Sequence, residues 1–179
     1  MLLPHFIERG IKEVPIDEVT FILKKSKATI YKHFDSHHEI VAMVIAKKLN
    51  DLKHFQPILA DPSKSYQERY VLAVAYVSKH LGDVSNAFLS DLKTIYPDLW
   101  ELINGFKLMA LNELRIFYVS GIADGTFENI NPDLMVLSDE LFFDALTNPE
   151  FLAEKGLNLQ AAFESYFRMR FYGILKQVN

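Results

Sequence analysis

The spacing of apolar residues constrains the fold of this 179-residue chain more than any other feature. Apolar side chains recur at the three- and four-residue intervals of amphipathic helices, as at Ile16, Val19 and Leu23, whereas the alternation typical of strands is hard to find. Glycine and proline, with seven of each, are scarce and interrupt these patterns seldom. The sequence therefore predicts an all-α protein.

Helix start and stop signals divide the chain into about nine helices. Gly10 is a natural left-handed cap for a first helix, and Ser36 with Glu39 forms a capping box ahead of "IVAMVIA". The expected helices cover residues 2–9, 15–23, 27–34, 37–55, 66–81, 84–95, 97–122, 133–147 and 159–177. The turn-forming stretch "ADPSKS" breaks the pattern after the fourth helix. We therefore expect two domains, over residues 1–54 and 55–179.

Positive charge is concentrated in the first domain, although the formal net charge of the chain is −4. Residues 1–54 hold nine Lys/Arg and seven Asp/Glu, whereas the remainder holds ten and sixteen. Lys24, Lys25, Lys27 and Lys32 follow one another without an acidic residue between them. Such a cluster favours a polyanion-facing surface, but a solvated helix face gives the same pattern, and charge alone does not separate the two.

Two short helices joined by a tight turn, the second of them basic, describe a helix-turn-helix over residues 15–34. In that motif the second helix enters the major groove of DNA. Lysines neutralise phosphates, small side chains permit close approach, and Tyr and His hydrogen-bond to phosphate oxygens. The free amides at the start of the next helix, at His37, offer a further anion site.

The motifs "FIERG", "IDEV", "SKATIYKHF" and "SHHEIV" resemble, in order and spacing, the DNA-binding domain of the tetracycline-repressor (TetR) family of bacterial regulators. Beyond roughly residues 3–50 the resemblance is one of outline: chain length, helix order, a "GIADGTF" turn and "FYGIL" near the end. It implies a three-helix helix-turn-helix domain with a shortened first helix. A long helix would join this domain to a helical bundle for ligand binding and dimerisation.

The resemblance also implies roles by position. Ile30 and Phe34 fall at core positions, while the basic helix and its flanks face the DNA. The DNA-binding candidates are Lys25, Ser26, Lys27, Ala28, Thr29, Tyr31, Lys32, His33 and His37.

The sequence departs from the family pattern at four points. Lys24 and Lys25 replace the turn glycine and the apolar residue after it, and a lysine at positive φ is strained, so we expect an altered turn. No Ser or Thr caps the second helix, and Phe21 and Ile22 occupy usually polar positions. The first helix is short by about two turns, which raises the hypothesis that the natural start lies upstream.

The second domain supplies candidates for a ligand pocket and for a dimer interface. Aromatic residues at helical positions form either ordinary core or an apolar pocket, the usual form of a ligand site. The pocket shortlist is Tyr70, Tyr76, His80, Phe88, Trp100, Phe106, Met109, Asn112 and Phe117. The last two helices are apolar on more than one face, which favours a two-fold dimer over a deeply buried monomer helix. The dimer candidates are Leu137, Leu141, Phe163, Tyr166, Phe167, Arg170, Phe171 and Ile174.

Several other classes of protein are disfavoured. The chain has no cysteine, so a disulfide framework and a thiolate site are excluded. The neighbouring His33, His37, His38 and Glu39 do not complete a coordination shell, and we expect no metal and no cofactor. No nucleophile motif or phosphate loop is present, so we expect no enzyme. "MLLPHFIERG" does not have the features of a signal peptide and no apolar run could span a bilayer, so a cytoplasmic protein without a membrane partner is expected.

These observations predict a dimeric transcriptional regulator, a repressor by resemblance. It would bind double-stranded operator DNA and be released by a small-molecule effector in the second domain. The alternative is a degenerate relative, in which the altered turn and shortened first helix leave DNA binding weak or absent. Its helical body would then act as a module that binds a small molecule or a protein.

Overall fold

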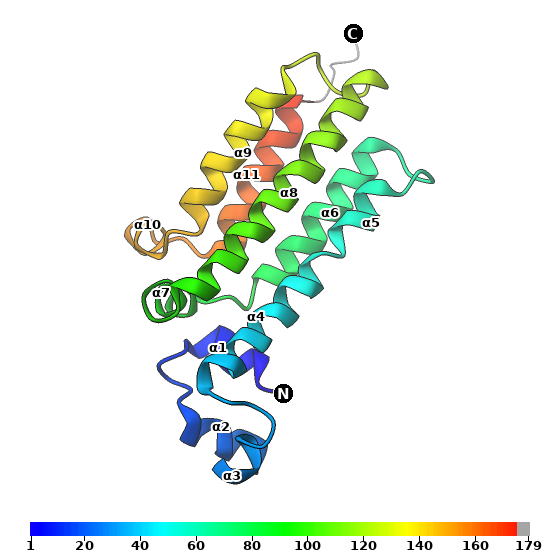
Figure 1. The fold of residues 1–179 in the computed structure, drawn as a ribbon. Helices are drawn as coiled ribbons and strands as arrows, with labels where there is room; N and C mark the ends of the chain where they lie inside the picture. The colour runs from blue at the N-terminus through cyan, green and yellow to red at the C-terminus, as the bar shows by residue number, and fades with distance from the viewer. Residues whose placement is uncertain (175–179) are drawn as a thin grey trace.

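A computed structural model describes residues 1–174 of the chain, and these residues form eleven helices (Figure 1). The helices are α1 (Leu3–Arg9), α2 (Ile16–Leu23), α3 (Lys27–Ile30), α4 (His37–Leu52), α5 (Phe55–Ala60), α6 (Tyr66–Leu81), α7 (Asn86–Ile95), α8 (Pro97–Ala123), α9 (Pro132–Leu146), α10 (Pro149–Glu154) and α11 (Leu159–Ile174). The all-α prediction is confirmed.

Two short helices were missing from the sequence-based prediction, α5 and α10, each of six residues. Such helices are shorter than the windows in which helical periodicity shows. The predicted fourth helix ends early because the His54 N–H turns back to Asp51 O, three residues away, in place of the next α-helical bond. The last predicted helix reaches beyond the described residues, and its part over 175–177 lies outside them.

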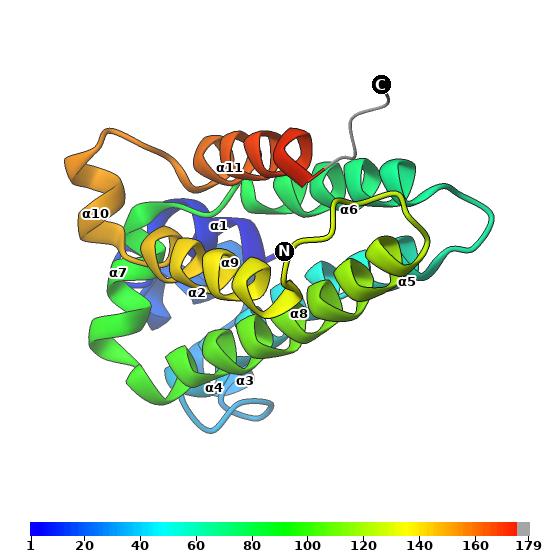
Figure 2. The ribbon, with the colours of Figure 1, turned by 90° about the horizontal axis from the view of Figure 1, so that it is seen from above.

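The molecule is elongated, with α1–α3 at one end and the longer helices forming a bundle at the other (Figure 1). Seen along the bundle, α8 lies beside α9, and α6 pairs with both α5 and α11 (Figure 2). Helix α4 joins the two ends, because it packs against α1 at its start and against α6 and α8 further along. Helix α4 therefore runs without interruption from the small end into the bundle.

The stretch "ADPSKS" connects α5 and α6, two neighbouring helices of the bundle. Asp61 organises this loop, because the Lys64 ammonium, the Ser63 hydroxyl (2.6 Å) and the Ser63 N–H (3.0 Å) all donate to its carboxylate. These bonds hold the pKa of Asp61 far below its usual range. The loop then ends in a full capping box, formed by Ser65 and Glu68 at the start of α6.

Serine hydroxyls begin four of the helices, including two that the sequence indicates. Ser26 accepts the Thr29 N–H at the start of α3, and Ser36 accepts the Glu39 N–H at the start of α4. The reciprocal half of the predicted box at α4 is displaced by one residue, because the Glu39 carboxylate accepts the N–H of Asp35. The expected helix starts are thus confirmed, with a variant of the box at α4.

A buried polar cluster ties α8, α9 and α11 together. The Asp139 carboxylate has no exposed surface, and it accepts hydrogen bonds from the hydroxyls of Tyr118 and Tyr166, each at 2.7 Å. The Arg170 Nε lies 3.4 Å from the same carboxylate, and the Arg170 guanidinium also donates to the carbonyl of Met135. Burial raises the pKa of Asp139, against the opposing effect of these donors.

Candidate functional site

The turn between α2 and α3 has the geometry of a Schellman motif with a lysine at its left-handed position. Lys24 has φ 52° and ψ 43°, and it is the non-glycine residue with positive φ within residues 1–174. Its N–H donates to Phe21 O, and the Lys25 N–H donates to Thr20 O. The expectation of an altered turn was wrong: the backbone keeps the glycine-type conformation and imposes it on a lysine.

Helix α3 presents most of the predicted DNA-contact residues to solvent. Exposed side chains are Lys25, Ser26, Lys27, Ala28, Tyr31, Lys32 and His33, and Thr29 is half-buried. On the opposite side Ile30 is only 3% exposed, and Phe34 packs against the core, which confirms both as anchors. The regular α-helix ends at Ile30, and hydrogen-bonded turns continue it to Phe34.

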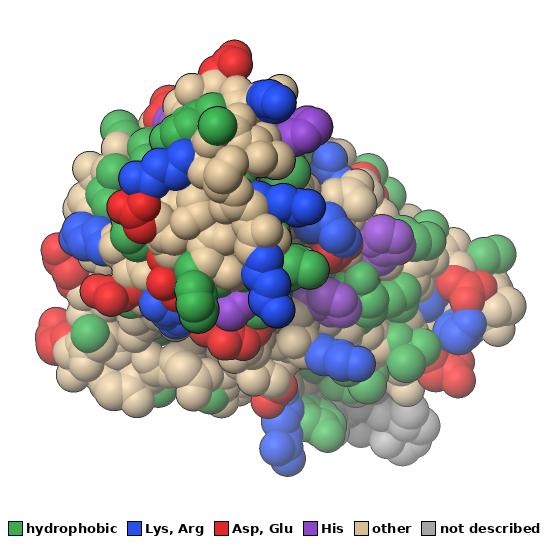
Figure 3. Space-filling view, turned by 90° about the horizontal axis from the view of Figure 1, so that it is seen from below, with side chains coloured by type: hydrophobic (Ala, Val, Ile, Leu, Met, Phe, Trp, Pro, Cys, Tyr) green, Lys and Arg blue, Asp and Glu red, His purple; other side chains and the backbone are tan. Residues whose placement is uncertain are grey.

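Lys, Arg and His side chains are scattered over this end of the molecule, between apolar and acidic ones (Figure 3). Three of the predicted contact residues already have partners. The Lys27 ammonium lies 2.6 Å from Asp17 on α2, and the hydroxyls of Ser26 and Thr29 lie 2.9 Å apart. A phosphate or base that bound here would compete with the carboxylate of Asp17 for Lys27.

The side chain of His37 does not face the same way as those of the other candidates. Its imidazole lies 2.8 Å from the carbonyl oxygen of Val14 and 3.1 Å from the hydroxyl of Tyr96, and it packs on the ring of Phe6. The side chain is therefore held inside the junction between the small end and the bundle. The predicted contact with phosphate at this position therefore involves the backbone amide at the start of α4 and not the imidazole.

The junction has a second polar contact, which the sequence analysis missed. Asp91 on α7 is buried, and its carboxylate binds both the backbone N–H of Lys12 (3.0 Å) and the Lys12 ammonium (2.9 Å). Gly10 makes room for it, because a Cβ there would lie 2.9 Å from Asp91 Oδ2. The glycine at position 10 was the available sequence signal, but the sequence analysis assigned it only a capping role. Its φ of 95° is one that glycine adopts more readily than other residues.

Two further contacts join α1 and α4 to the bundle. The Ser85 N–H, at the start of α7, donates to the carbonyl of Ile7 (3.0 Å), and His38 Nε2 lies 2.6 Å from Asp98 Oδ2. The His38 contact lowers the pKa of Asp98. The small end is thus fastened to α7 and to the start of α8 by hydrogen bonds as well as by apolar packing.

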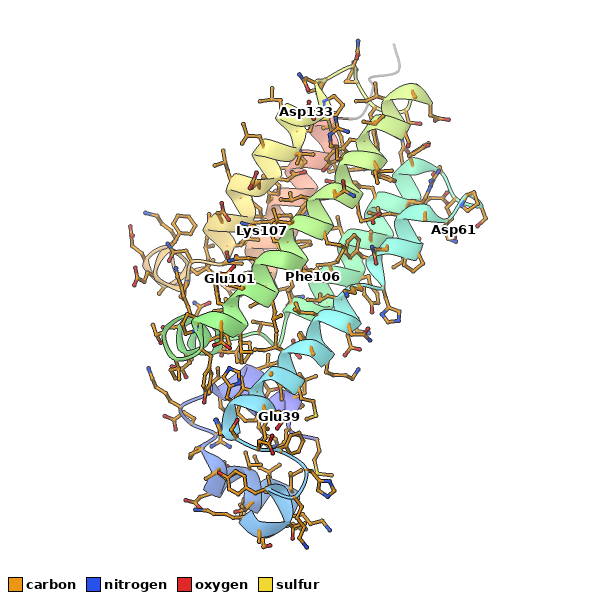
Figure 4. All side chains as sticks on the ribbon, viewed as in Figure 1. Glu39, Asp61, Glu101, Phe106, Lys107 and Asp133 are labelled. Carbon is orange, nitrogen blue, oxygen red and sulfur yellow. The ribbon has the colours of Figure 1, made fainter. Side chains whose placement is uncertain are left out.

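A cavity of about 180 Å³ lies within the bundle, between α4, α5, α6, α7, α8, α9 and α11. Its walls present apolar surface. Three shortlisted residues line it: Tyr70, Phe88 and Phe106. Figure 4 shows Phe106 and Lys107 on α8, and the two side chains contact different neighbours, the Phe55 ring on α5 and Asp144 on α9.

The other six shortlisted residues do not line this cavity. They are Tyr76, His80, Trp100, Met109, Asn112 and Phe117. Helix rotation explains the α8 misses, since Asn112 lies two residues, or about 200°, from both Ala110 and Leu114, which do line it. Composition gave no means of choosing the inner face, because α8 is apolar on several sides.

The dimer candidates fall into three groups by exposure. Leu137 and Leu141 on α9 are exposed, and Tyr166, Arg170 and Phe171 on α11 are half-buried. Phe163, Phe167 and Ile174 are buried within the subunit, which corrects their assignment to an interface. The exposed apolar face of these helices consists instead of Leu134, Leu137 and Leu141 with Ala161, Met169 and Tyr172.

Residues 1–174 contain neither a metal-binding cluster nor a membrane-spanning helix. No group of three or more His, Asp or Glu side chains there is arranged to hold a metal ion. None of the helices described has the length and apolar character needed to cross a membrane.

The fold is that of a known class of regulators. No family model matches the chain, and no curated protein matches its sequence. A transcriptional regulator of Saccharomonospora viridis, solved with choline, aligns with a TM-score of 0.75 at 17% identity, over 98% of this chain and 94% of that one. A TetR-family regulator of Cytophaga hutchinsonii gives a TM-score of 0.70 at 16% identity, over 99% and 92%.

A third solved structure, Bacillus subtilis FadR with stearoyl-CoA, gives a TM-score of 0.67 at 16% identity, over 97% and 95% of the two chains. All three are described as transcriptional regulators. The chain has the TetR-family regulator fold along its whole described length, as the helix-turn-helix motifs predict.

Proposed function

We propose that the chain is a cytoplasmic, ligand-responsive transcriptional repressor that binds operator DNA through α3. The observation that carries this proposal is the surface of α3, where basic, small and aromatic side chains face solvent while Ile30 anchors the opposite side. In our proposal residues 1–54 form the DNA-binding domain and residues 55–179 the regulatory and dimerisation domain. The choline and stearoyl-CoA complexes of two proteins of similar fold support a small-molecule effector for the cavity.

The second part of the proposal is a homodimer. The exposed face of α9 and α11 carries large apolar side chains at helical spacing, and pairing two copies would bury them in a four-helix interface. A two-fold dimer would place two copies of α3 in successive major grooves, about 34–36 Å apart, on a (pseudo)palindromic operator.

A gel-shift assay with the region upstream of the chain's own gene tests DNA binding. We expect Lys32→Ala or Lys27→Ala to weaken binding by roughly 1–3 kcal/mol if the lysine contacts a base, or to lower the salt slope by about one if it contacts phosphate. Lys155→Ala is the control, because Lys155 is an exposed lysine beside Glu154 at the end of α10. Unchanged affinity and slope in both test variants would contradict the assignment of α3.

Analytical ultracentrifugation tests the dimer. Leu137→Glu combined with Leu141→Glu should convert a dimer into a monomer, because charge would replace apolar contacts at the proposed interface. Leu108→Glu, at an exposed leucine on α8, should leave the dimer intact. A monomer in the unmodified protein at micromolar concentration would rule the dimer out.

A degenerate regulator is the second candidate, and the strained Lys24 with the four-residue α3 favours it. In that case the upstream DNA fails to bind at any salt concentration while ligand binding in the bundle persists. The same gel-shift assay therefore separates the two functions.

A further inference from the structure

The cavity in the bundle has a wall to which no polar atom of its described lining residues contributes surface. Most of these residues are leucine, isoleucine, valine, phenylalanine or alanine, and none of them is acidic. The cavity therefore offers a ligand apolar contact and a shape, but no hydrogen-bonding group and no charge.

Two lysines line the cavity without presenting their ammonium groups to it. Lys48 on α4 pairs with Asp83 in the loop before α7. Lys107 on α8 pairs with Asp144 on α9. Neither aspartate lines the cavity, so both ammonium groups point out of it and only the aliphatic stems of the lysines border it.

The two other polar lining side chains, Thr147 and Tyr70, do not offer a hydroxyl to the cavity either. The Thr147 hydroxyl donates to the carbonyl of Phe143 (2.9 Å) at the end of α9. The Tyr70 hydroxyl has no hydrogen-bond partner among the described residues, but protein atoms cover it almost completely. A ligand in the cavity therefore contacts the ring of Tyr70 and not its oxygen.

An apolar cavity of about 180 Å³ is costly when it is empty. The side chains on its wall lose the dispersion contacts that they would make in a close-packed interior. Water does not restore these contacts, because a buried water molecule needs several polar partners and this wall has none. An apolar ligand would restore them, whereas any polar group on a ligand would be buried without a partner.

We propose that the effector is a small, uncharged and wholly apolar molecule, about the size of one six-membered ring with one or two attached carbons. This inference rests on the proposed regulatory function of the bundle and names the chemistry of its ligand. A cavity of about 150 Å³ in another protein holds one benzene molecule, so about 180 Å³ suits a slightly larger ring. A charged group of either sign would lose its hydration and find no opposite charge on the wall.

Helix α4 connects this cavity to the DNA-binding end. Ile45, Leu49 and Leu52 line the cavity from one face of α4, and the start of the same helix packs against α1. A ligand of this class favours the position of α4 that fits it best. It changes DNA binding only to the extent that it binds that state more tightly than the other.

Calorimetric titration of the DNA-free protein tests the ligand class apart from the regulatory function. Toluene is the apolar probe, and phenol has nearly the same shape with a hydroxyl in place of the methyl group. We expect toluene to bind about ten- to a hundredfold more tightly than phenol, because the wall gives a hydroxyl no partner. Benzoate and benzylammonium, which carry opposite charges, should bind more weakly than phenol.

Two variants test whether toluene occupies this cavity. Ala110 lines it from α8, so Ala110→Leu should fill part of the space and abolish toluene binding. The same variant should raise the thermal stability of the ligand-free protein, a gain that a misfolded protein cannot give. Ala123→Leu, at an exposed alanine at the end of the same helix, is the matched control and should keep toluene binding. Tyr70→Phe should change the affinity for neither toluene nor phenol.

Several results would overturn the inference. They are a failure of toluene to bind at its solubility limit, binding of phenol, benzoate or benzylammonium as tight as that of toluene, toluene binding that survives Ala110→Leu, and weaker phenol binding in Tyr70→Phe. These titrations use the unmodified protein for the ligand series, so they stand whether or not a variant folds. Because no DNA is present, a failed gel shift would overturn the regulatory function and leave this result intact.

Discussion

The surface of α2 and α3 and the Asp139 cluster inside the bundle use similar side chains in opposite surroundings. Lys27 and Asp17 form an ion pair in which both side chains are largely exposed to water. Arg170 and Asp139 also form an ion pair, with Nε 3.4 Å from the carboxylate, but this carboxylate has no exposed surface. Each carboxylate has a cation within 4 Å, yet only one is removed from solvent.

The difference teaches which polar groups can change partners. An exposed pair contributes little to stability, so a phosphate can replace Asp17 beside Lys27 at small cost. A buried carboxylate without its donors is costly, so Asp139 must keep Tyr118, Tyr166 and Arg170 in place. The α2–α3 surface is therefore suited to recognition, whereas the Asp139 cluster fixes how α8, α9 and α11 pack.

The strongest test of this contrast removes the buried carboxylate. Asp139→Ala should lower the free energy of unfolding by about 3–5 kcal/mol, because it leaves the Arg170 guanidinium and two tyrosine hydroxyls without their acceptor. Asp133→Ala, at an exposed aspartate on the same helix that pairs with Arg115, should cost no more than about 1 kcal/mol. Urea unfolding of both variants gives the comparison. Equal losses of unfolding free energy would show that burial of a carboxylate does not determine how much it contributes to stability.

The junction between the regions is tested at Gly10. Gly10→Ala should destabilise the protein by about 1–3 kcal/mol, because the residue has positive φ and the added Cβ would crowd Asp91 and Ala87. Gly105→Ala, in the interior of α8 with open space around it, should instead raise stability by about 0.5–1 kcal/mol. Thermal unfolding measures both changes in stability. An unchanged stability of Gly10→Ala would mean that the residues around position 10 can shift to accommodate the added Cβ at little cost.

The strained turn gives a smaller effect of opposite sign. Lys24→Gly should stabilise the protein by about 0.5–1 kcal/mol, because glycine adopts the left-handed conformation without the steric cost that lysine has there. Lys25→Gly is the control, and it should not stabilise, because the left-handed residue of the turn is Lys24. Lower stability of Lys24→Gly in urea would contradict the assignment of strain to this residue.

The smallest effect is a difference in pH dependence between an exposed and a buried carboxylate. His38 lowers the pKa of Asp98, so its contribution to stability is present above the ordinary aspartate pKa and is lost as pH falls through the lowered value. Burial raises the pKa of Asp139, so its contribution is fullest below the ordinary pKa and declines as pH rises through the raised value.

Unfolding of Asp98→Asn and Asp139→Asn in acid checks these signs. As pH falls, the stability of the unmodified protein relative to Asp98→Asn should decrease, whereas its stability relative to Asp139→Asn should increase. Parallel curves for the two variants would contradict the opposite shifts.

Local sequence signals were sufficient for nine of the eleven described helices and for the outward face of α3. Ser26 and Ser36 mark helix starts because a side-chain oxygen satisfies a free amide a few residues away, a contact that needs no tertiary partner. Ile30 and Phe34 could be assigned to the core because they stand four residues apart on one helix face. Charge, spacing and motif order then predicted the class of fold.

Only the tertiary structure decided which polar and aromatic groups come into contact when they are far apart in the sequence. Asp91 reaches Lys12, and Lys48 reaches Asp83, across separations that no local pattern records. The rotation of α11 placed Phe163 and Phe167 on the cavity wall and left Met169 and Tyr172 exposed. Helical periodicity shows that a face is apolar, but only packing against the other helices determines whether that face borders the core, a cavity or solvent.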